Sequence, residues 1–195
     1  LDPSTKSLNN AEKLWNEIIS TGNNHKLNLI QNYSQIPNEI DLAIISTTAN
    51  VRLKVIKELI EQFHIRAWIL EKVLVQSPED LNELEKNLLN VTSAWVNCGY
   101  RAMLMHQKLH SIISNQAPIE VYAGKGDWGL ACNTVHFLDL MTWWTSEKLL
   151  KIDTSNLDNT WVKCKRRGFW EISGTLKASY SNGSKLVLES CLDGE

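Results

Sequence analysis

The chain has 195 residues, of which 43% are hydrophobic and 22% charged, and these values predict a globular protein with one large domain or two small ones. Its net charge of −2 gives no overall field for nucleic acid or an anionic membrane, and no apolar run approaches the roughly 20 residues of a membrane-spanning helix. The four cysteines are far apart and form no CxxC pair, which argues against a zinc site or a disulfide framework and favours reduced thiols in a cytoplasmic protein.

Helix and strand patterns alternate along the first half of the chain. The continuous apolar run in residues 40–47 is typical of a strand that is covered on both faces. Ser77 and Pro78 have the residue types of a helix N-cap and first helical position. The apolar stripe of the second helix consists of Val51, Val55, Leu59 and Ile60. The predicted elements are helix 8–20, strand 26–32, strand 40–47, helix 50–63, strand 65–75, helix 77–90 and strand 93–98.

Strands that alternate with helices in this way predict a doubly wound parallel sheet over residues 1–98. In such a sheet, ligands bind at the carboxyl ends of the strands. The polar residues that we expect at this edge are Asp2, Ser46, Thr47, Thr48, Glu71, Lys72 and Asn97.

The second half, residues 99–195, has a different pattern and predicts an α+β domain with a mainly antiparallel sheet. The sequence SNGS at 181–184 is a hairpin signal between two strand-like runs. The predicted elements are helix 101–114, strand 119–126, helix 132–144, and strands 159–165, 168–181 and 184–191.

Lys72 and His136 are the two candidates for proton chemistry. A lysine at a strand end is often a solvated surface residue, whereas in the ligand crevice it would polarise a carbonyl or share a substrate proton. His136 lies on a helix near Asn133, three residues before Asp139, and imidazole is well suited to proton transfer at neutral pH. The alternative for this helix is a polar patch in which Asp139 fixes a neighbouring side chain.

Other patterns are weaker. Asp2 is placed to bind ribose hydroxyls, with a turn aspartate before Pro3 as the alternative. The pair His106 and His110 lacks the glutamate of a helical zinc motif, so we expect no metal site. We interpret the basic run in 163–168 as a solvated strand end, and the eight tryptophans mainly as core residues.

Together these segments resemble the glucose–fructose oxidoreductase, inositol dehydrogenase and MocA family, usually written Gfo/Idh/MocA. The resemblance runs from Asp2 to about residue 145. The matching segments are similar to the family's strand–turn–helix beside the nicotinamide, its Glu-Lys-Pro segment, its crossing into the second domain and its histidine-bearing helix. They are, in that order, residues 39–53, 71–84, 95–103 and 129–140.

The resemblance implies a fragment of a longer protein that lacks the glycine-rich first strand and turn. It implies a partial Rossmann-like dinucleotide-binding domain over 1–98 and a partial substrate and oligomerisation domain over 99–195. The implied activity is NAD(P)-dependent hydride transfer to or from a carbinol carbon of a sugar, sugar nucleotide or polyol. An acid at position 2 favours NAD, with NADP as the alternative. A homo-oligomer through the second-domain sheet is also expected.

The resemblance further implies a role for each candidate residue. His136 would accept or donate the substrate proton, and Lys72 would orient the same oxygen. Tyr100, Arg101 and Asn133 would bind substrate. The expected cofactor-binding residues are Asp2, Ser46, Thr47, Thr48, Glu71 and Lys72.

Three positions depart from the family pattern. Val73 replaces the proline that follows the lysine, and Cys132 and Thr134 replace an acid and a glycine before the histidine. These changes support an alternative function, in which a catalytically degenerate relative binds a sugar or nucleotide as a sensor or assembly partner.

Overall fold

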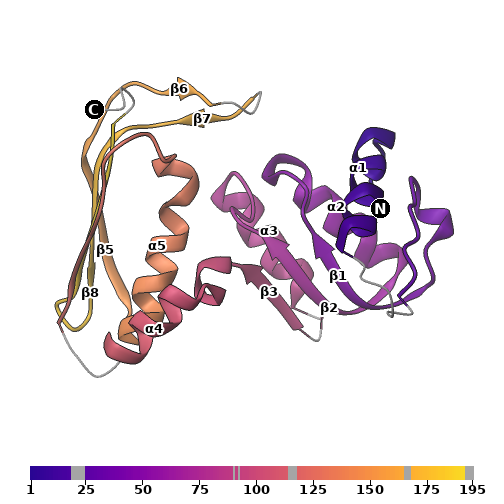
Figure 1. The fold of residues 1–195 in the computed structure, drawn as a ribbon, viewed down its shortest axis with the longest axis horizontal. Coiled ribbons are helices and arrows are strands. Elements are labelled where there is room, and N and C mark those ends of the chain that lie inside the picture. Colours follow the sequence, from indigo (N-terminus) through magenta and orange to yellow (C-terminus); the bar gives the residue numbers. More distant parts are fainter. Residues whose placement is uncertain (19–24, 90, 92, 114–117, 165–167, 192–195) are drawn as a thin grey trace.

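The computed structural model describes residues 1–18, 25–89, 91, 93–113, 118–164 and 168–191. It contains a three-stranded sheet and a four-stranded sheet, each covered by helices, with a separate two-stranded hairpin (Figure 1). The segment that follows β3 leads from the first sheet into the second, and helix α5 faces the first sheet across the space between them (Figure 1).

The first sheet has the parallel order β1-β2-β3, as predicted. Its strands are β1 (Glu39–Ile45), β2 (His64–Glu71) and β3 (Ser93–Asn97). Helix α2 (Ala49–Gln62) joins β1 to β2, and α3 (Pro78–Leu88) follows β2. Before them lie α1 (Thr5–Ile18) and the short 3-10 helix η1 (Tyr33–Gln35). All three strands therefore end at one edge, where the sequence predicted a ligand crevice.

The core of this part lies between one sheet face and helices α2 and α3. Its buried side chains include Ile45, Ile56, Trp68, Leu70 and Leu84. The start of α3 is capped as predicted, because the Ser77 side chain accepts a hydrogen bond from the Asp80 N–H at 3.1 Å and Pro78 is the first helical residue.

The prediction that the strand at 40–47 is covered on both faces was wrong. Leu42 and Ile44 are exposed, and the register continues their row through Ile69 to Trp95, which is 57% exposed. One face of the sheet therefore carries apolar side chains that no described element covers. The apolar run indicated strand structure but not how many faces were packed.

Two further predictions need correction. No strand forms at 26–32, although the Asp2 N–H donates to the Ile30 carbonyl at 3.1 Å. The buried residues of α2 are Arg52, Ile56 and Leu59, whereas Val51 is exposed. The buried stripe is rotated relative to the predicted one, and Arg52, which the predicted stripe did not include, occupies part of it. Residues 19 and 20 of the predicted first helix lie outside the described part of the chain.

The second sheet is mixed and mainly antiparallel, with the order β4-β9-β8-β5. Only β4 and β9 pair in parallel. Its strands are β4 (Glu120–Ala123), β5 (Leu149–Leu157), β8 (Gly174–Tyr180) and β9 (Lys185–Ser190). The helices are η2 (Gly99–Ala102), α4 (Leu104–Ile113) and α5 (Leu130–Thr145), and strands β6 (Val162–Lys163) and β7 (Trp170–Glu171) form the hairpin.

Helices α4 and α5 cover one face of this sheet (Figure 1). The core between them contains Met141 and Trp144 of α5 and Tyr180, Leu186 and Leu188 of the sheet. The predicted turn at 181–184 is confirmed, since Tyr180 and Ser184 pair across it at 3.0 Å.

Strand β5 was not predicted, because its exposed residues include many polar ones and give no clear alternation. The run 168–181 divides into β7 and β8 at Gly174, whose φ of +105° is a glycine conformation. Within the described residues, no helix combines the length and apolar character that crossing a membrane requires.

Candidate functional site

Lys72 follows β2 directly and reaches across to helix α5. Its Nζ donates to the Cys132 carbonyl at 3.0 Å and to Asn133 Oδ1 at 3.2 Å, with Cys132 Sγ at 3.4 Å. These acceptors lie in the first turn of α5, the helix that also carries His136. The predicted lysine is therefore at the edge where the parallel strands end, and it links that edge to the start of helix α5.

Arg52 fixes the loop that follows Lys72. It is only 1% exposed, and its Nη1 donates to the Val73 carbonyl and, at 2.9 Å, to the Leu74 carbonyl. Its Nη2 donates to the Thr47 carbonyl, in the turn after β1. Burial lowers the pKa of Arg52, and the charge of Glu71 opposes this effect. The guanidinium therefore ties together the turns that follow β1 and β2.

Sequence reasoning missed Arg52. The available signal was its position four residues before Ile56, on the stripe of α2 that is buried. An arginine on a buried stripe needs acceptors, because a buried charge without hydrogen bonds is very costly. The peptide bond between Lys72 and Val73 in the loop that it holds is cis.

His136 is buried in a stack of aromatic rings. The Tyr100 ring lies parallel to its imidazole, with centroids 4.2 Å apart and an interplanar angle of 13°. Tyr100 also stacks on His106, with centroids 5.6 Å apart and an interplanar angle of 11°. Burial lowers the pKa of His136 and the charge of Lys72 lowers it further, while Glu71 and Asp139 act in the opposite direction. The imidazole is therefore kept neutral at neutral pH.

The start of α5 is held by residues on both sides. Asn133 Nδ2 donates to the Trp128 carbonyl at 2.6 Å, so its amide links Lys72 to the preceding loop. Glu171 of β7 accepts from the backbone N–H of Ala131 and, at 3.4 Å, from that of Cys132. A carboxylate at a helix N-terminus satisfies its unpaired amides and opposes its dipole. No local sequence signal identified Glu171, because it caps a helix forty residues earlier.

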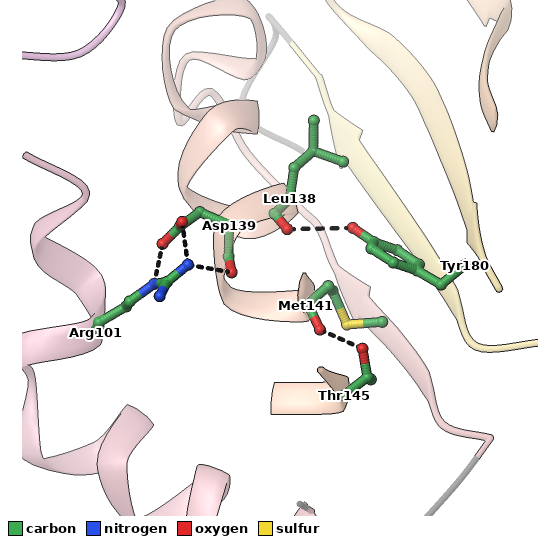
Figure 2. A network of polar contacts seen from close by, with 6 residues as sticks. All are labelled: Arg101, Leu138, Asp139, Met141, Thr145 and Tyr180. Carbon is green, nitrogen blue, oxygen red and sulfur yellow. Dashed lines mark hydrogen bonds and ion pairs between the residues drawn. The ribbon is translucent and has the colours of Figure 1, made fainter. Parts of the chain in front are cut away.

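Arg101 is bound within the protein, as Figure 2 shows. Its Nε donates to Asp139 Oδ2 at 2.6 Å and its Nη2 to Asp139 Oδ1. The guanidinium also lies 5.7 Å from the ring centroid of Trp143. Asp139 therefore fixes a neighbouring side chain, the alternative that the sequence left open. The same helix accepts a hydrogen bond from Tyr180 at the Leu138 carbonyl (3.3 Å), also drawn in Figure 2.

The predicted cofactor residues fall into two groups. Ser46, Thr47, Thr48 and Glu71 follow β1 or end β2, at the same sheet edge as Lys72. Glu71 Oε2 accepts from Asn97 Nδ2 at 3.0 Å, and Thr47 Oγ1 is buried without a hydrogen-bond partner in the described part of the chain. An unpaired buried hydroxyl fits a polar ligand group at this edge.

Asp2 lies outside the strand ends that carry these residues. It precedes α1, where its Oδ1 accepts from the Ser4 N–H at 2.7 Å. The N-terminus lies at the end of the molecule remote from α5 (Figure 1). The contacts of Asp2 are those of the turn aspartate that the sequence offered as the alternative.

Two cavities flank the 72–76 loop. One, of about 650 Å³, lies between this loop and α5 and has mostly apolar walls that include Val96, Val135 and Leu138. The other, of about 780 Å³, lies between the loop, the start of α5 and the β6–β7 hairpin. Lys72 lines both, so its ammonium is accessible from the larger cavity.

Comparison with protein-family models found no match, and neither did comparison with curated proteins. Solved structures do match. A myo-inositol dehydrogenase from Lactobacillus casei, in complex with NAD(H) and myo-inositol, has 14% identity and a TM-score of 0.58, and the match covers 80% of this chain and 49% of that one.

Two other matches are similar in extent. The WlbA dehydrogenase from Chromobacterium violaceum, in complex with NADH and UDP-GlcNAcA, has 17% identity and a TM-score of 0.54, with 78% of this chain and 49% of that one covered. The super-repressor mutant of Gal80p from Saccharomyces cerevisiae has 13% identity and a TM-score of 0.62, with 78% and 50% covered.

These identities are too low to transfer an activity, but the fold agreement extends over both sheets. The chain spans about half the length of the solved structures that it matches. Over that half, the chain has the fold of the Gfo/Idh/MocA-type oxidoreductases.

Proposed function

We propose that the protein containing this chain is an NAD(P)-dependent oxidoreductase that transfers a hydride between nicotinamide and a carbinol carbon of a sugar, sugar nucleotide or polyol. The observation that carries the proposal is the contact of Lys72 with the first turn of the helix that bears His136. Two proteins of the same fold are named as dehydrogenases and were solved with NAD(H) or NADH and with myo-inositol or UDP-GlcNAcA.

His136 takes the substrate hydroxyl proton in this proposal. Its lowered pKa keeps the imidazole neutral, so the ring carries a lone pair that accepts the proton at neutral pH. Because Nδ1 is buried without a partner in the described chain, we assign the accepting lone pair to Nε2. In the reverse direction the same nitrogen returns the proton to the product oxygen.

Lys72 holds the reacting oxygen. An ammonium has three N–H donors, and two of them are directed at the Cys132 carbonyl and Asn133 Oδ1. Within the described residues, the remaining acceptor near Nζ is the thiol of Cys132, a weak acceptor, at 3.4 Å. A substrate oxygen replaces this sulfur as a better acceptor, and the cation then stabilises the negative charge that develops on that oxygen.

The nicotinamide cofactor supplies the hydride chemistry when bound. We assign its contacts to Ser46, Thr47, Thr48 and Glu71, supported by the unpaired Thr47 hydroxyl. Its ribose hydroxyls are assigned to Asp2, whose carboxylate reaches them only if it gives up its bond from the Ser4 N–H. The acid at position 2 favours NAD over NADP, because a carboxylate repels a 2′-phosphate.

On the substrate side, the proposal keeps Tyr100, Arg101 and Asn133. The Asn133 amide acts by holding the Lys72 ammonium, and Tyr100 by packing on His136. Arg101 reaches a substrate only if it gives up bonds to Asp139.

The test uses the natural full-length protein with NAD and a panel of sugars, sugar nucleotides and polyols, and measures NADH formation. We expect Lys72→Met and His136→Asn each to lower kcat roughly 100-fold or more with the fold retained. Lys57→Met and His64→Asn are matched controls, because these residues lie on α2 and at the start of β2, and His64 is exposed there. Near-normal turnover by either site variant would remove that residue from the mechanism.

A second candidate function is a binding protein without turnover, such as a sugar or nucleotide sensor. It is supported by the replacements at Val73, Cys132 and Thr134, and by the match to Gal80p, whose name describes repression rather than catalysis. Calorimetry with NADH and with the sugar panel separates the two candidates: binding without any NADH formation or consumption favours the sensor.

We also propose that the protein is cytoplasmic and pairs as a homo-oligomer through the face of the four-stranded sheet opposite α4 and α5. Light scattering after gel filtration gives the oligomeric state, and Tyr122→Arg on β4, whose side chain is exposed, should shift it towards the monomer.

A further inference from the structure

The β6–β7 hairpin stands apart from the two larger sheets. It pairs only within itself, through Val162 with Glu171 and Lys163 with Trp170. Figure 1 shows it extending from the second sheet past the start of α5 towards the first sheet. A two-stranded hairpin has little core of its own, so large side chains on it are available to another molecule.

Two tryptophans on this hairpin contradict the interpretation of the tryptophans as core. Trp161 is 56% exposed and Trp170 is 52% exposed, and both line the cavity of about 780 Å³. Indole rings bury much apolar area and also carry an N–H donor, which makes them frequent anchors at binding sites. Lys163 Nζ lies 5.8 Å from the ring centroid of Trp170, so a cation also lies at this wall.

The opposite wall of the same cavity contains Lys72 and Gln76. The hairpin tryptophans and the ammonium assigned to the reacting oxygen therefore share one space. Its volume is towards the upper end of the range for small-molecule sites, about 300–1,000 Å³. The space extends from Lys72 outwards to the hairpin, so it accommodates a ligand longer than a single reacting ring.

The charged side chains that line this cavity indicate what net charge its ligand carries. Lys72 and Lys163 face two carboxylates, Asp127 and Glu171. Among the described lining residues, positive and negative groups are therefore balanced, so these residues give no net attraction to a phosphate or a carboxylate. Mixed donors and acceptors around aromatic faces suit a neutral ligand with many hydroxyl groups.

We propose that the hairpin is a second subsite for a neutral carbohydrate of at least two linked rings. One ring reacts beside Lys72 and His136, and the next ring stacks its C–H face on Trp161 and Trp170. This inference rests on the proposed function for the reacting ring only, since the hairpin binds its ring whether or not hydride is transferred.

The experiment compares the full-length wild-type protein with Trp161→Ala and Trp170→Leu. Trp95→Ala is the matched control, because Trp95 is 57% exposed but lies on β3, outside the cavity. Binding is measured by calorimetry with neutral disaccharides and their methyl glycosides. Turnover is measured with the same compounds and with the corresponding monosaccharides. Circular dichroism establishes that each variant is folded.

We expect each hairpin substitution to weaken disaccharide affinity roughly tenfold and to raise KM by a similar factor, with kcat and monosaccharide kinetics unchanged. Trp95→Ala should have no effect. If the hairpin variants lose disaccharide binding and the wild type shows no turnover, the subsite is supported and the oxidoreductase function is rejected. Three outcomes overturn the subsite: no neutral disaccharide binds, affinity is the same in both hairpin variants, or the substitutions weaken only NADH or sugar-nucleotide binding.

Discussion

At the scale of single residues, the Tyr100 ring stacks on the imidazoles of both His136 and His106. Its ring faces, rather than its hydroxyl, make the contacts that concern the candidate base. The packing excludes water from one face of His136, and burial is the main cause of the lowered pKa of that residue. Tyr100 is therefore a positioning residue, since it acts on proton transfer through the imidazole.

This role predicts different effects for two substitutions of Tyr100. Phenylalanine keeps the stacked ring, so the pKa of His136 should stay below the ordinary histidine value of about 6.5. Alanine opens the face of the imidazole to water, so the pKa should rise towards that value. Titration of the His136 ring signals by NMR measures both. An unchanged pKa in Tyr100→Ala would assign the shift to groups other than the stack.

Arg52 gives a second prediction at this scale. Arg52→Met leaves the carbonyls of Thr47 and Leu74 without their donor. Each unsatisfied buried group costs about 1–3 kcal/mol, so for two carbonyls we expect a loss of roughly 2–6 kcal/mol in the free energy of unfolding, measured with urea. Arg66→Met is the control, since Arg66 pairs with Asp41 on the surface and its loss should cost under about 1 kcal/mol. Equal effects of the two substitutions would contradict the role of Arg52 in holding together the turns that follow β1 and β2.

At the scale of elements, α4 and α5 are joined through buried histidines. His106 of α4 and His136 of α5 both have lowered pKa values, chiefly because of burial. In the pH range between the lowered pKa values of these histidines in the folded chain and about pH 6.5, the unfolded chain therefore binds more protons than the folded chain. The stability from these groups is therefore complete above about pH 6.5 and is lost as the pH falls through that window.

We accordingly expect the melting temperature to fall between pH 7.5 and pH 5.5 more steeply in the wild type than in His106→Phe. Phenylalanine keeps a ring against Tyr100 and Trp144 but cannot take up a proton. The surface carboxylates titrate in both proteins, so the difference between the two melting-temperature profiles gives the contribution of His106 alone. Parallel profiles would show that protonation of His106 does not oppose folding.

At the scale of the whole molecule, the apolar row Leu42, Ile44, Ile69 and Trp95 is the largest departure from the expected packing. Contiguous exposed apolar surface binds apolar dyes and promotes association. We expect the 195-residue chain to enhance the fluorescence of anilinonaphthalene sulfonate, and the pair Ile44→Thr and Trp95→Thr to reduce this enhancement with little change in melting temperature. Threonine is β-branched and therefore suits a strand at both positions. An unaltered fluorescence enhancement in this variant would show that the dye binds to another surface of the chain.

Local signals accounted for the elements that have clear periodicity or caps. The alternation from β1 to β3 and the Ser77 cap were predicted because their determinants lie within a few residues. Strand β5 escaped detection because pairing with β8, rather than its own polar sequence, makes it a strand. The exposed face of β1 was mispredicted for a related reason, since an apolar run does not reveal which neighbours cover it.

The site followed the same division between local and distant determinants. Lys72 and its proximity to the helix of His136 were expected from the family resemblance and the rule for strand ends. Arg52 and Glu171 were missed, because their partners lie elsewhere in the chain: the carbonyls of 73 and 74 for one, and the amides of 131 and 132 for the other.

The capping of α5 by Glu171 has a mechanical consequence. Glu171 follows Trp170 directly in β7, and its carboxylate accepts hydrogen bonds from the first backbone amides of α5, the helix that bears His136. Moving the hairpin away from α5 would leave the amides of Ala131 and Cys132 without this acceptor, so the carboxylate ties the hairpin to the start of the helix. The proposed sugar subsite at Trp170 therefore lies one residue along β7 from the carboxylate that caps the helix of His136, and Glu171 connects the two.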